Sequence, residues 1–178
     1  KHRAIAANRK LEILWVEAQH LEPEFESKDS EGYAKAWETV RRADGVLVPG
    51  GFGNRGVEGK ILAANYARTS KTPYLGVCLG MQCAVIEFAR NMCGLKDANS
   101  SEFDDKAEHQ AIIFMPEINP DQMGGTMRLG ERVTLLKEYD GVPHTIATTV
   151  YGDVGEVEER HRHRYEVNPE LVAAMEEK

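Results

Sequence analysis

The chain has 178 residues, of which 42% are hydrophobic, so it is long enough to bury the core of one globular domain. Its formal net charge of -7 is spread over short acidic stretches with no polybasic tail, which argues against a nucleic-acid partner or an anionic membrane surface. No apolar run reaches the roughly 18 residues that a membrane span needs, and residues 1–10 lack the apolar core of a signal peptide, so we expect a cytoplasmic protein.

In the first half of the chain, short apolar runs alternate with longer amphipathic ones, which is typical of parallel strands joined by helices. In chain order, the spacing predicts the end of a helix at 4–8, a strand at 11–16, a helix around 33–40, a strand at 45–48, a glycine loop at 49–53, a helix around 61–66, a strand at 74–77 and a helix at 81–92. Gly94 is expected to end the last of these helices.

The second half is more polar. We expect long loops over 95–120 around the apolar run 111–115, a hairpin pairing 125–130 with 132–136 about Gly130 and Glu131, and a loop over 137–150. Asn168 and Pro169 predict the N-cap and first position of a final helix over 170–177. Together these elements indicate a three-layer α/β fold, with a mostly parallel sheet between flanking helices, in one domain over residues 1–178.

Cys78 stands between two glycines, Gly76 and Gly80, where a predicted strand meets a predicted helix. This arrangement is typical of a nucleophile elbow, in which a sharp turn strains the backbone of the middle residue and exposes its side chain. The N-terminus of the helix would favour the reactive thiolate. Backbone N–H groups of Leu79 and Gly51 could form an oxyanion hole, because both follow strands that end at the same sheet edge.

The alternative for Cys78 is a buried structural cysteine, with glycines present only for packing. For Cys83 and Cys93, which lack flanking glycines, that alternative is the better one, and we assign them no chemistry. Three cysteines without metal-type spacing also argue against a disulfide framework and a zinc site, so we predict no metal.

Three segments, taken together, resemble a known family: residues 48–53 (Val-Pro-Gly-Gly-Phe-Gly), 75–82 (Leu-Gly-Val-Cys-Leu-Gly-Met-Gln) and 160–168 (Arg-His-Arg-His-Arg-Tyr-Glu-Val-Asn). The first two resemble class I glutamine amidotransferases in general. The third, with residues 98–103 and 124–130, resembles the glutamine amidotransferase domain of the CTP synthase family, and the likeness spans nearly the whole chain. It implies a flavodoxin-like fold and a Cys-His-Glu triad.

The resemblance implies that the domain hydrolyses L-glutamine through a thioester on Cys78. The ammonia would then reach a synthase domain of the same polypeptide, where ATP and magnesium support the amination of UTP to CTP and GTP acts as an activator. No cofactor is implied for the amidotransferase domain itself. For the parent protein, the family implies a homotetramer that also assembles into filaments.

The resemblance also implies how glutamine is bound around the elbow. Gly51 and Leu79 would supply the N–H groups of the oxyanion hole. Gly80, Met81 and Gln82 would line the glutamine pocket beside them.

Two charged residues are implied to hold the charged end of the substrate. Glu102 would bind the α-ammonium of free glutamine and Arg164 its α-carboxylate, since these groups suit a carboxylate and a guanidinium. The alternatives are a solvated loop acid for Glu102 and a surface cation for Arg164. Arg55, Gly56 and Glu58 resemble a lid segment near the place where GTP acts, and an ordinary loop leading into a helix is the alternative.

We assign no general base for Cys78. His161, or His163 with Glu166, could be taken for it, but the resemblance places the catalytic pair in a His-x-Glu motif beyond the arginine-histidine run, and no such motif follows Arg164. We therefore expect a domain that lacks its first strand and its C-terminal His-x-Glu segment. Residues 1–178 alone should then show little glutaminase turnover.

Two other interpretations stay open. One is a non-catalytic module that retains the fold for assembly or regulation. Another is a related hydrolase of the PfpI type, whose site also centres on an elbow cysteine, although that would leave residues 160–168 unexplained. A nucleic-acid role for Arg160, Arg162 and Arg164 is disfavoured, because the cluster lacks interleaved aromatic residues and lies in an acidic chain.

Overall fold

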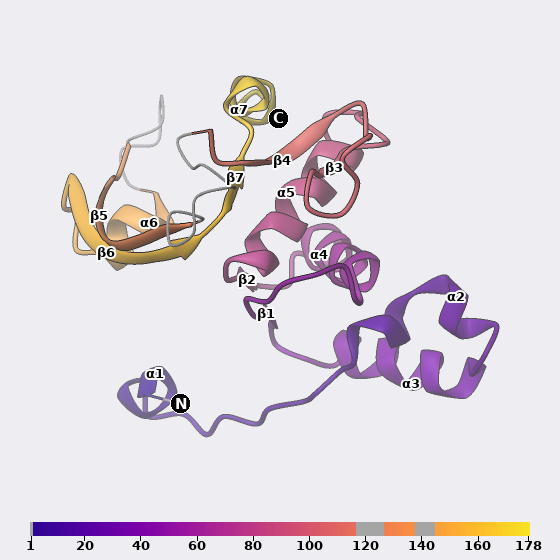
Figure 1. The fold of residues 1–178 in the computed structure, drawn as a ribbon. Helices are drawn as coiled ribbons and strands as arrows, with labels where there is room; N and C mark the ends of the chain where they lie inside the picture. The colour runs from indigo at the N-terminus through magenta and orange to yellow at the C-terminus, as the bar shows by residue number, and fades with distance from the viewer. Residues whose placement is uncertain (1, 117–126, 138–144) are drawn as a thin grey trace. The chain divides into compact units, whose positions relative to one another are not determined.

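The computed structural model describes residues 2–116, 127–137 and 145–178, and Figure 1 labels its helices and strands. The chain divides into two compact units, one of Lys1–Ile113 with Val167–Lys178 and one of Phe114–Glu166. None of the helices in the described part of the chain is long and apolar enough to span a lipid bilayer.

The elements up to the elbow are the helix α1 (His2–Ala6), the short 3₁₀ helix η1 (Ala18–Leu21), α2 (Pro23–Glu26), α3 (Ser30–Arg41), β1 (Val46–Val48), α4 (Val57–Ser70), β2 (Tyr74–Gly76) and α5 (Leu79–Asn91). The later elements are β3 (Asn99–Ser100), β4 (Gln110–Phe114), β5 (Arg128–Leu135), α6 (Ile146–Val150), β6 (Glu156–His163), β7 (Tyr165–Val167) and α7 (Pro169–Glu176).

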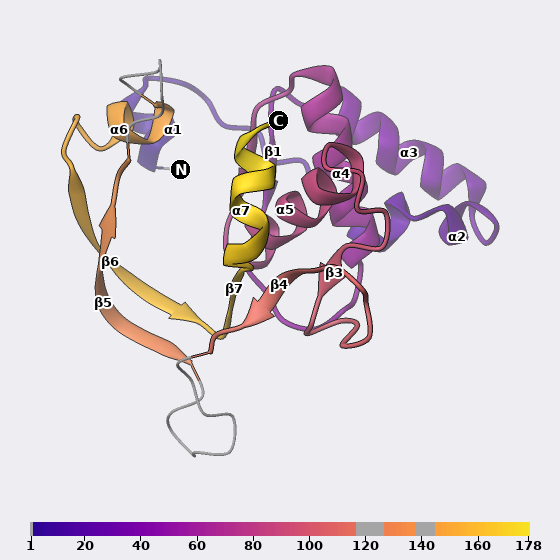
Figure 2. The ribbon, with the colours of Figure 1, turned by 90° about the horizontal axis from the view of Figure 1, so that it is seen from above.

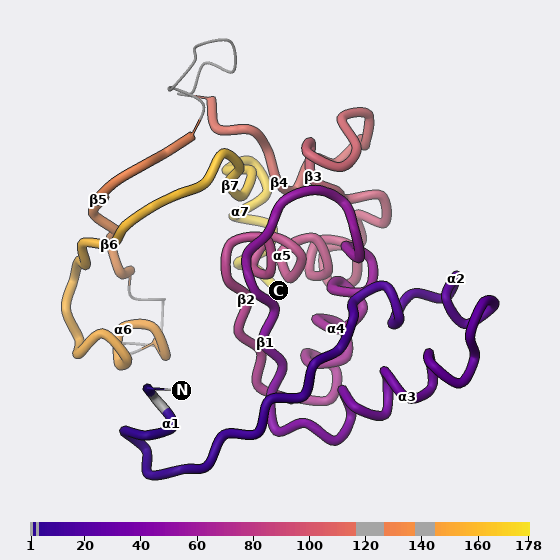
Figure 3. The backbone as a smooth tube through the Cα atoms, turned by 60° about the horizontal axis from the view of Figure 1, so that its bottom comes forward, coloured from indigo at the N-terminus to yellow at the C-terminus, as the bar shows by residue number. Residues whose placement is uncertain are grey.

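The run β1-α4-β2-α5 is the α/β segment that the sequence predicts. β1 and β2 pair in parallel, with Val46 opposite Tyr74 and Val48 opposite Gly76. Figure 3 traces the backbone from β1 through loop 49–56 into α4, and then through β2 into α5. Because the two strands run in the same direction, the loops that follow them leave from the same edge of the sheet.

The helix predicted around 33–40 is confirmed as α3. Asp29 caps it, since its carboxylate accepts a hydrogen bond from the backbone N–H of Gly32. The indole N–H of Trp37 donates to the carbonyl oxygen of Leu21 at 3.2 Å, which joins α3 to η1. The buried core between these elements consists of Leu21, Ala36, Val40 and Ala63.

A buried ion pair joins α4 to α5. Arg68 donates to both carboxylate oxygens of Glu87, with a closest distance of 2.8 Å, and the Glu87 side chain is only 3% exposed. Asn91 donates to the same carboxylate at 2.9 Å. The buried charge therefore has several hydrogen-bond partners, and the pair fixes the helix that begins directly after Cys78.

The final helix is confirmed as α7, with the predicted cap. The Asn168 side chain accepts from the N–H of Glu170 at 3.0 Å and donates to the carbonyl oxygen of Gln110 at 2.9 Å. The cap residue therefore also ties α7 to β4, which pairs in parallel with β3. Figure 2 shows α7 following directly after β7, and the Cys93 Sγ lies 3.8 Å from the carbonyl oxygen of Ala174.

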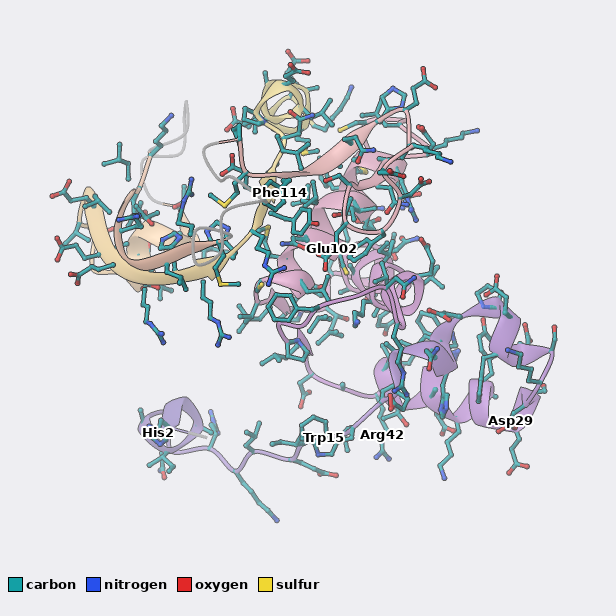
Figure 4. The ribbon with its side chains drawn as sticks, in the orientation of Figure 1. His2, Trp15, Asp29, Arg42, Glu102 and Phe114 are labelled. Atoms are coloured by element: carbon teal, nitrogen blue, oxygen red, sulfur yellow. The ribbon has the colours of Figure 1, made fainter. Side chains whose placement is uncertain are left out.

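The predicted strand at 11–16 is wrong. This segment has neither helix nor strand, and Leu11, Ile13 and Trp15 are 51%, 48% and 87% exposed (Figure 4). The alternation of apolar residues is present in the sequence. A strand also needs a neighbour to satisfy its backbone groups, and alternation by itself cannot supply one.

The predicted hairpin about Gly130 and Glu131 is also wrong. Gly130 lies inside β5, which pairs antiparallel with β6 and places Gly130 opposite His161; residues 125 and 126 of the predicted first arm lie outside the described residues. Opposite charges face each other in the pairs Glu131 with Arg160 and Arg132 with Glu159, and such pairs favour the observed register.

The loop predicted over 137–150 contains a short helix, α6, so that prediction is wrong for 146–150. The hydroxyl of Thr145 caps the helix by accepting from the N–H of Thr148 at 3.1 Å. Gly141 and Pro143, which suggested a loop, lie outside the described residues.

Candidate active site

Cys78 joins β2 to α5 in a strained backbone conformation. Its φ of 53° and ψ of -109° lie outside the regions that L residues populate. α5 begins at the next residue, Leu79, and the N–H of Gln82 donates to the carbonyl oxygen of Cys78 at 3.0 Å. The backbone is therefore that of a sharp strand-to-helix turn with the cysteine at its apex.

The glycines on either side of Cys78 are required by close backbone contacts. A Cβ on Gly76 would lie 2.5 Å from the carbonyl carbon of Gly80, and a Cβ on Gly80 would lie 2.1 Å from the carbonyl oxygen of Val48. Side-chain atoms do not approach backbone so closely. The glycines thus allow the first turn of α5 to pack directly against β1 and β2.

The glycine loop after β1 approaches the elbow after β2. A Cβ on Gly50 would lie 3.2 Å from the Cβ of Cys78 and 4.0 Å from its Sγ, and a Cβ on Gly51 would lie 3.4 Å from Cδ2 of Leu79. The structure therefore brings the two segments together, as expected for loops at one sheet edge. Backbone N–H groups in such neighbouring loops can stabilise a developing oxyanion.

Glu102 is tied to the glycine loop. The N–H of Gly53 donates to Oε1 of Glu102 at 3.2 Å, and the N–H of Glu102 donates to the hydroxyl of Ser100 at 3.2 Å. Figure 4 labels Glu102 on the loop that follows β3. This contact argues against an unattached loop acid. The sequence does not predict this contribution of Gly53, because Glu102 lies 49 positions further along the chain and no local pattern joins the two residues.

The first turn of α5 is mostly buried, whereas Cys78, the residue before it, is only half-buried. Leu79 and Gln82 are 2% and 4% exposed and Gly80 is buried, whereas Met81 is 39% exposed and Cys78 is half-buried. Cys78 is therefore accessible to a small molecule, while the residues that follow it anchor the turn in the protein core.

The other cysteine on α5 differs sharply from Cys78. Cys83 is fully buried, and burial raises the pKa of its thiol to about 11. It is therefore a protonated, unreactive thiol at neutral pH, as expected for a structural cysteine.

Arg164 belongs to the second unit, where it lies between β6 and β7. Its carbonyl oxygen accepts from the N–H of Met115 at 2.9 Å. Cys78 and Glu102 belong to the first unit. Joint binding of glutamine by Glu102 and Arg164 therefore stays a prediction.

The two histidines of the arginine-histidine run contact each other. Nδ1 of His163 lies 3.0 Å from the carbonyl oxygen of Tyr165, and its Nε2 lies 3.0 Å from Nδ1 of His161. Burial, and then the neighbouring His163, lowers the pKa of His161. Both ring nitrogens of His163 are thus engaged next to their own strand, which supports leaving the general base unassigned.

The segment predicted as a lid is anchored to its neighbours. Arg55 donates to the side-chain oxygen of Gln19 at 3.0 Å, and Glu58 pairs with Arg90 at 2.8 Å. Gly56 has a φ of 67° and precedes the first residue of α4. These contacts suit an ordinary loop that leads into a helix as well as a lid, so the link to GTP stays a prediction.

One group of side chains has metal-like proximity. The ligand atoms of Asp97, Glu108 and His109 all lie within 4.8 Å of one another. The Asp97 carboxylate already accepts from the N–H groups of Glu108 and His109 and pairs with the His109 ring, and the bond from that ring lowers the pKa of Asp97. These contacts join Asp97, which precedes β3, to the two residues that precede β4, and they explain why the three side chains lie close together.

Several known proteins are similar to this chain. The family model described as glutamine amidotransferase class-I matches residues 1–177. A CTP synthase of Neurospora crassa is 54% identical over 177 residues, which is 99% of this chain and 30% of that protein. CTP synthase 1 of Danio rerio is 55% identical over 178 residues, which is 100% of this chain and 29% of that protein.

A solved structure is similar as well. The glutaminase domain of a Trypanosoma brucei CTPS with bound acivicin has a TM-score of 0.84 and 40% sequence identity. The match covers 99% of this chain and 62% of that one. Of the two curated relatives, by contrast, the chain spans only about 30% of the length.

Proposed function

Because the chain belongs to the glutamine amidotransferase class-I family, we propose that it hydrolyses L-glutamine to glutamate and ammonia with Cys78 as the nucleophile. The observation that carries the proposal is the strained backbone of Cys78, with a φ of 53°, directly beside the glycine loop. A residue is held in such a conformation only where the surrounding structure enforces it, and such residues cluster at functional sites.

The chemistry follows from the groups around the elbow. The Cys78 thiolate attacks the side-chain amide carbon of glutamine, and the carbonyl oxygen becomes an oxyanion that the N–H groups of Gly51 and Leu79 stabilise. The C–N bond then breaks, and the nitrogen leaves as ammonia after it has taken up a proton. Water attacks the resulting thioester, which releases glutamate and restores the thiol. We assign the proton-transferring base to no residue of this chain.

Recognition of glutamine rests on two charges at its α-carbon. Glu102 binds the α-ammonium, and its hydrogen bond from Gly53 supports a placement beside the glycine loop. Arg164 binds the α-carboxylate, and Gly80, Met81 and Gln82 line the pocket. A glutamine inside a peptide lacks both charges, so this arrangement would reject it.

The proposal extends to the whole protein. The ammonia released from glutamine aminates UTP to CTP in a synthase domain that uses ATP and magnesium. GTP activates the reaction through the segment of Arg55, Gly56 and Glu58. The protein forms homotetramers and filaments in the cytoplasm. Relatives named CTP synthase, 54% and 55% identical over nearly the whole chain, support this extension.

The test uses the full-length protein and two nitrogen sources. In a Cys78→Ala variant, CTP formation from glutamine should be lost, whereas CTP formation from added ammonium chloride should remain. A Cys93→Ala variant, which changes a cysteine without an elbow, should retain both activities. Glutamine-dependent CTP formation by the Cys78→Ala variant would overturn the proposal.

A further inference from the structure

A tyrosine side chain spans the elbow. Tyr74 is the first residue of β2, and its hydroxyl donates to the carbonyl oxygen of Gly80 at 2.8 Å. Gly80 lies in the first turn of α5, on the other side of Cys78. The hydrogen bond therefore ties the strand that enters the elbow to the helix that leaves it.

Gly76 creates the space that this bond uses. Tyr74 and Gly76 are two residues apart in β2, so their Cα–Cβ directions fall on the same face of the strand. A Cβ on Gly76 would lie 2.5 Å from the N atom of Met81 and 2.6 Å from the carbonyl oxygen of Gly80. The missing side chain lets the peptide group between Gly80 and Met81 come down onto β2, within reach of the tyrosine hydroxyl.

The surroundings of Tyr74 keep its hydroxyl protonated, so that it can donate a hydrogen bond. Burial raises the pKa of this hydroxyl, and the negative charge of Glu87 acts in the same direction. The hydroxyl therefore keeps its proton at neutral pH. A hydrogen bond in a partly buried place is also stronger than the same bond in water.

The bond matters because the elbow is strained. With a φ of 53°, Cys78 keeps its conformation only while the segments on both sides are held. If the first turn of α5 moved away from β2, the backbone of Cys78 could relax. The thiol would then turn, and the N–H of Leu79 would leave its place beside Gly51.

We propose that Tyr74 is a positioning residue for the nucleophile. Its hydroxyl holds the peptide group after Gly80, so that the Cys78 thiol and the Leu79 N–H keep the geometry that reaction requires. The inference rests on the proposed role of Cys78 and adds a residue that acts through it.

The test measures covalent modification of Cys78 by acivicin, the small molecule bound to the similar Trypanosoma brucei domain. The maximal modification rate and the half-saturating acivicin concentration are determined for the unaltered full-length protein and for its Tyr74→Phe variant, which lacks one oxygen and keeps the ring. Tyr33→Phe removes the same atom from α3 and is the matched control.

We expect the maximal rate of Tyr74→Phe to fall about three- to tenfold, as befits the loss of one hydrogen bond. The half-saturating concentration should stay within roughly twofold, because no charge that binds acivicin is altered. Amide hydrogen exchange at Gln82, whose N–H bonds to Cys78, should become faster.

Two failures can be told apart. An unchanged rate in Tyr74→Phe, with the unaltered protein reacting normally, would overturn the inference alone, and so would an equal fall in Tyr33→Phe. If acivicin left Cys78 of the unaltered full-length protein unmodified, the proposed function would be overturned and the inference with it. A purely structural role would lower the unfolding temperature while the rate per folded molecule stayed constant.

Discussion

The backbone N–H of Gly53 donates to a carboxylate oxygen of Glu102 at 3.2 Å. This bond joins the glycine loop after β1 to the loop after β3, two segments that are far apart in the sequence. It places a negative charge beside the loop that approaches Cys78. The bond places Glu102 beside the glycine loop, and its role in binding the substrate stays a prediction.

Neutralising Glu102 should weaken glutamine binding while the loop stays in place. In Glu102→Gln the side-chain carbonyl can still accept from Gly53, but the charge that binds the α-ammonium is gone. The glutamine concentration that half-protects Cys78 from acivicin should rise about 10- to 100-fold, in line with a charge-assisted hydrogen bond. Glu108→Gln, a matched change at an exposed acid, should leave protection unchanged. Equal protection in the two variants would exclude the role of Glu102.

A side chain at position 76 should open the elbow. Gly76→Ala would force a Cβ to within 2.5 Å of the Gly80 backbone, so the first turn of α5 must move. We expect a loss of about 1–3 kcal/mol in urea unfolding and at least a tenfold slower reaction of Cys78 with acivicin. Gly155→Ala is the control, because a Cβ there meets nothing within 4 Å. Normal stability and reactivity in Gly76→Ala would contradict the described packing.

Removing Arg68 should cost far more stability than removing an exposed arginine. Arg68→Ala leaves the Glu87 carboxylate, only 3% exposed, without its cation, at a cost of about 3 kcal/mol. Arg55→Ala breaks a pair whose side chains are 73% and 61% exposed, at a cost below about 0.5 kcal/mol. Urea unfolding measures both changes. Similar losses in the two variants would show that the pair between α4 and α5 is not structural.

Cys83 should make stability depend on pH in the alkaline range. Burial raises the pKa of its thiol from 9.0 to about 11, so the folded state holds this proton more tightly than the unfolded state does. Its contribution is complete below pH 9 and is lost as the pH rises toward 11. Between pH 8 and pH 10, the unaltered chain should lose about 1 kcal/mol of unfolding free energy relative to Cys83→Ala. Parallel pH profiles for the two proteins would refute this burial effect.

The sequence predicted the elements around the elbow well, because their signals are local. Apolar runs of strand length, helical spacing and flanking glycines all lie within a few residues of β1, β2 and α5. The Asn168 cap was predicted for the same reason. These local features and the family resemblance also predict Cys78 as the nucleophile, and its position at a strained strand-to-helix turn is confirmed.

The wrong or missing predictions mostly concern contacts between residues that are distant in the sequence. The strand predicted at 11–16 has no partner in the described structure, and the strand that pairs with Gly130 lies some thirty residues away at His161. The contact between Gly53 and Glu102 and the bond of Tyr74 across the elbow were missed because they depend on folded geometry. The hydroxyl of Thr145 was a local signal for α6 that could have been recognised.

Peptide mapping by mass spectrometry, after treatment of the full-length protein with acivicin in the presence and absence of L-glutamine, tests most directly whether Cys78 is a glutamine-binding nucleophile. We expect one adduct among Cys78, Cys83 and Cys93, on Cys78, whose formation L-glutamine suppresses, and no adduct on the buried Cys83. Modification spread over Cys78, Cys83 and Cys93, or modification of Cys78 that L-glutamine does not slow, would contradict a glutamine-binding nucleophile at this elbow.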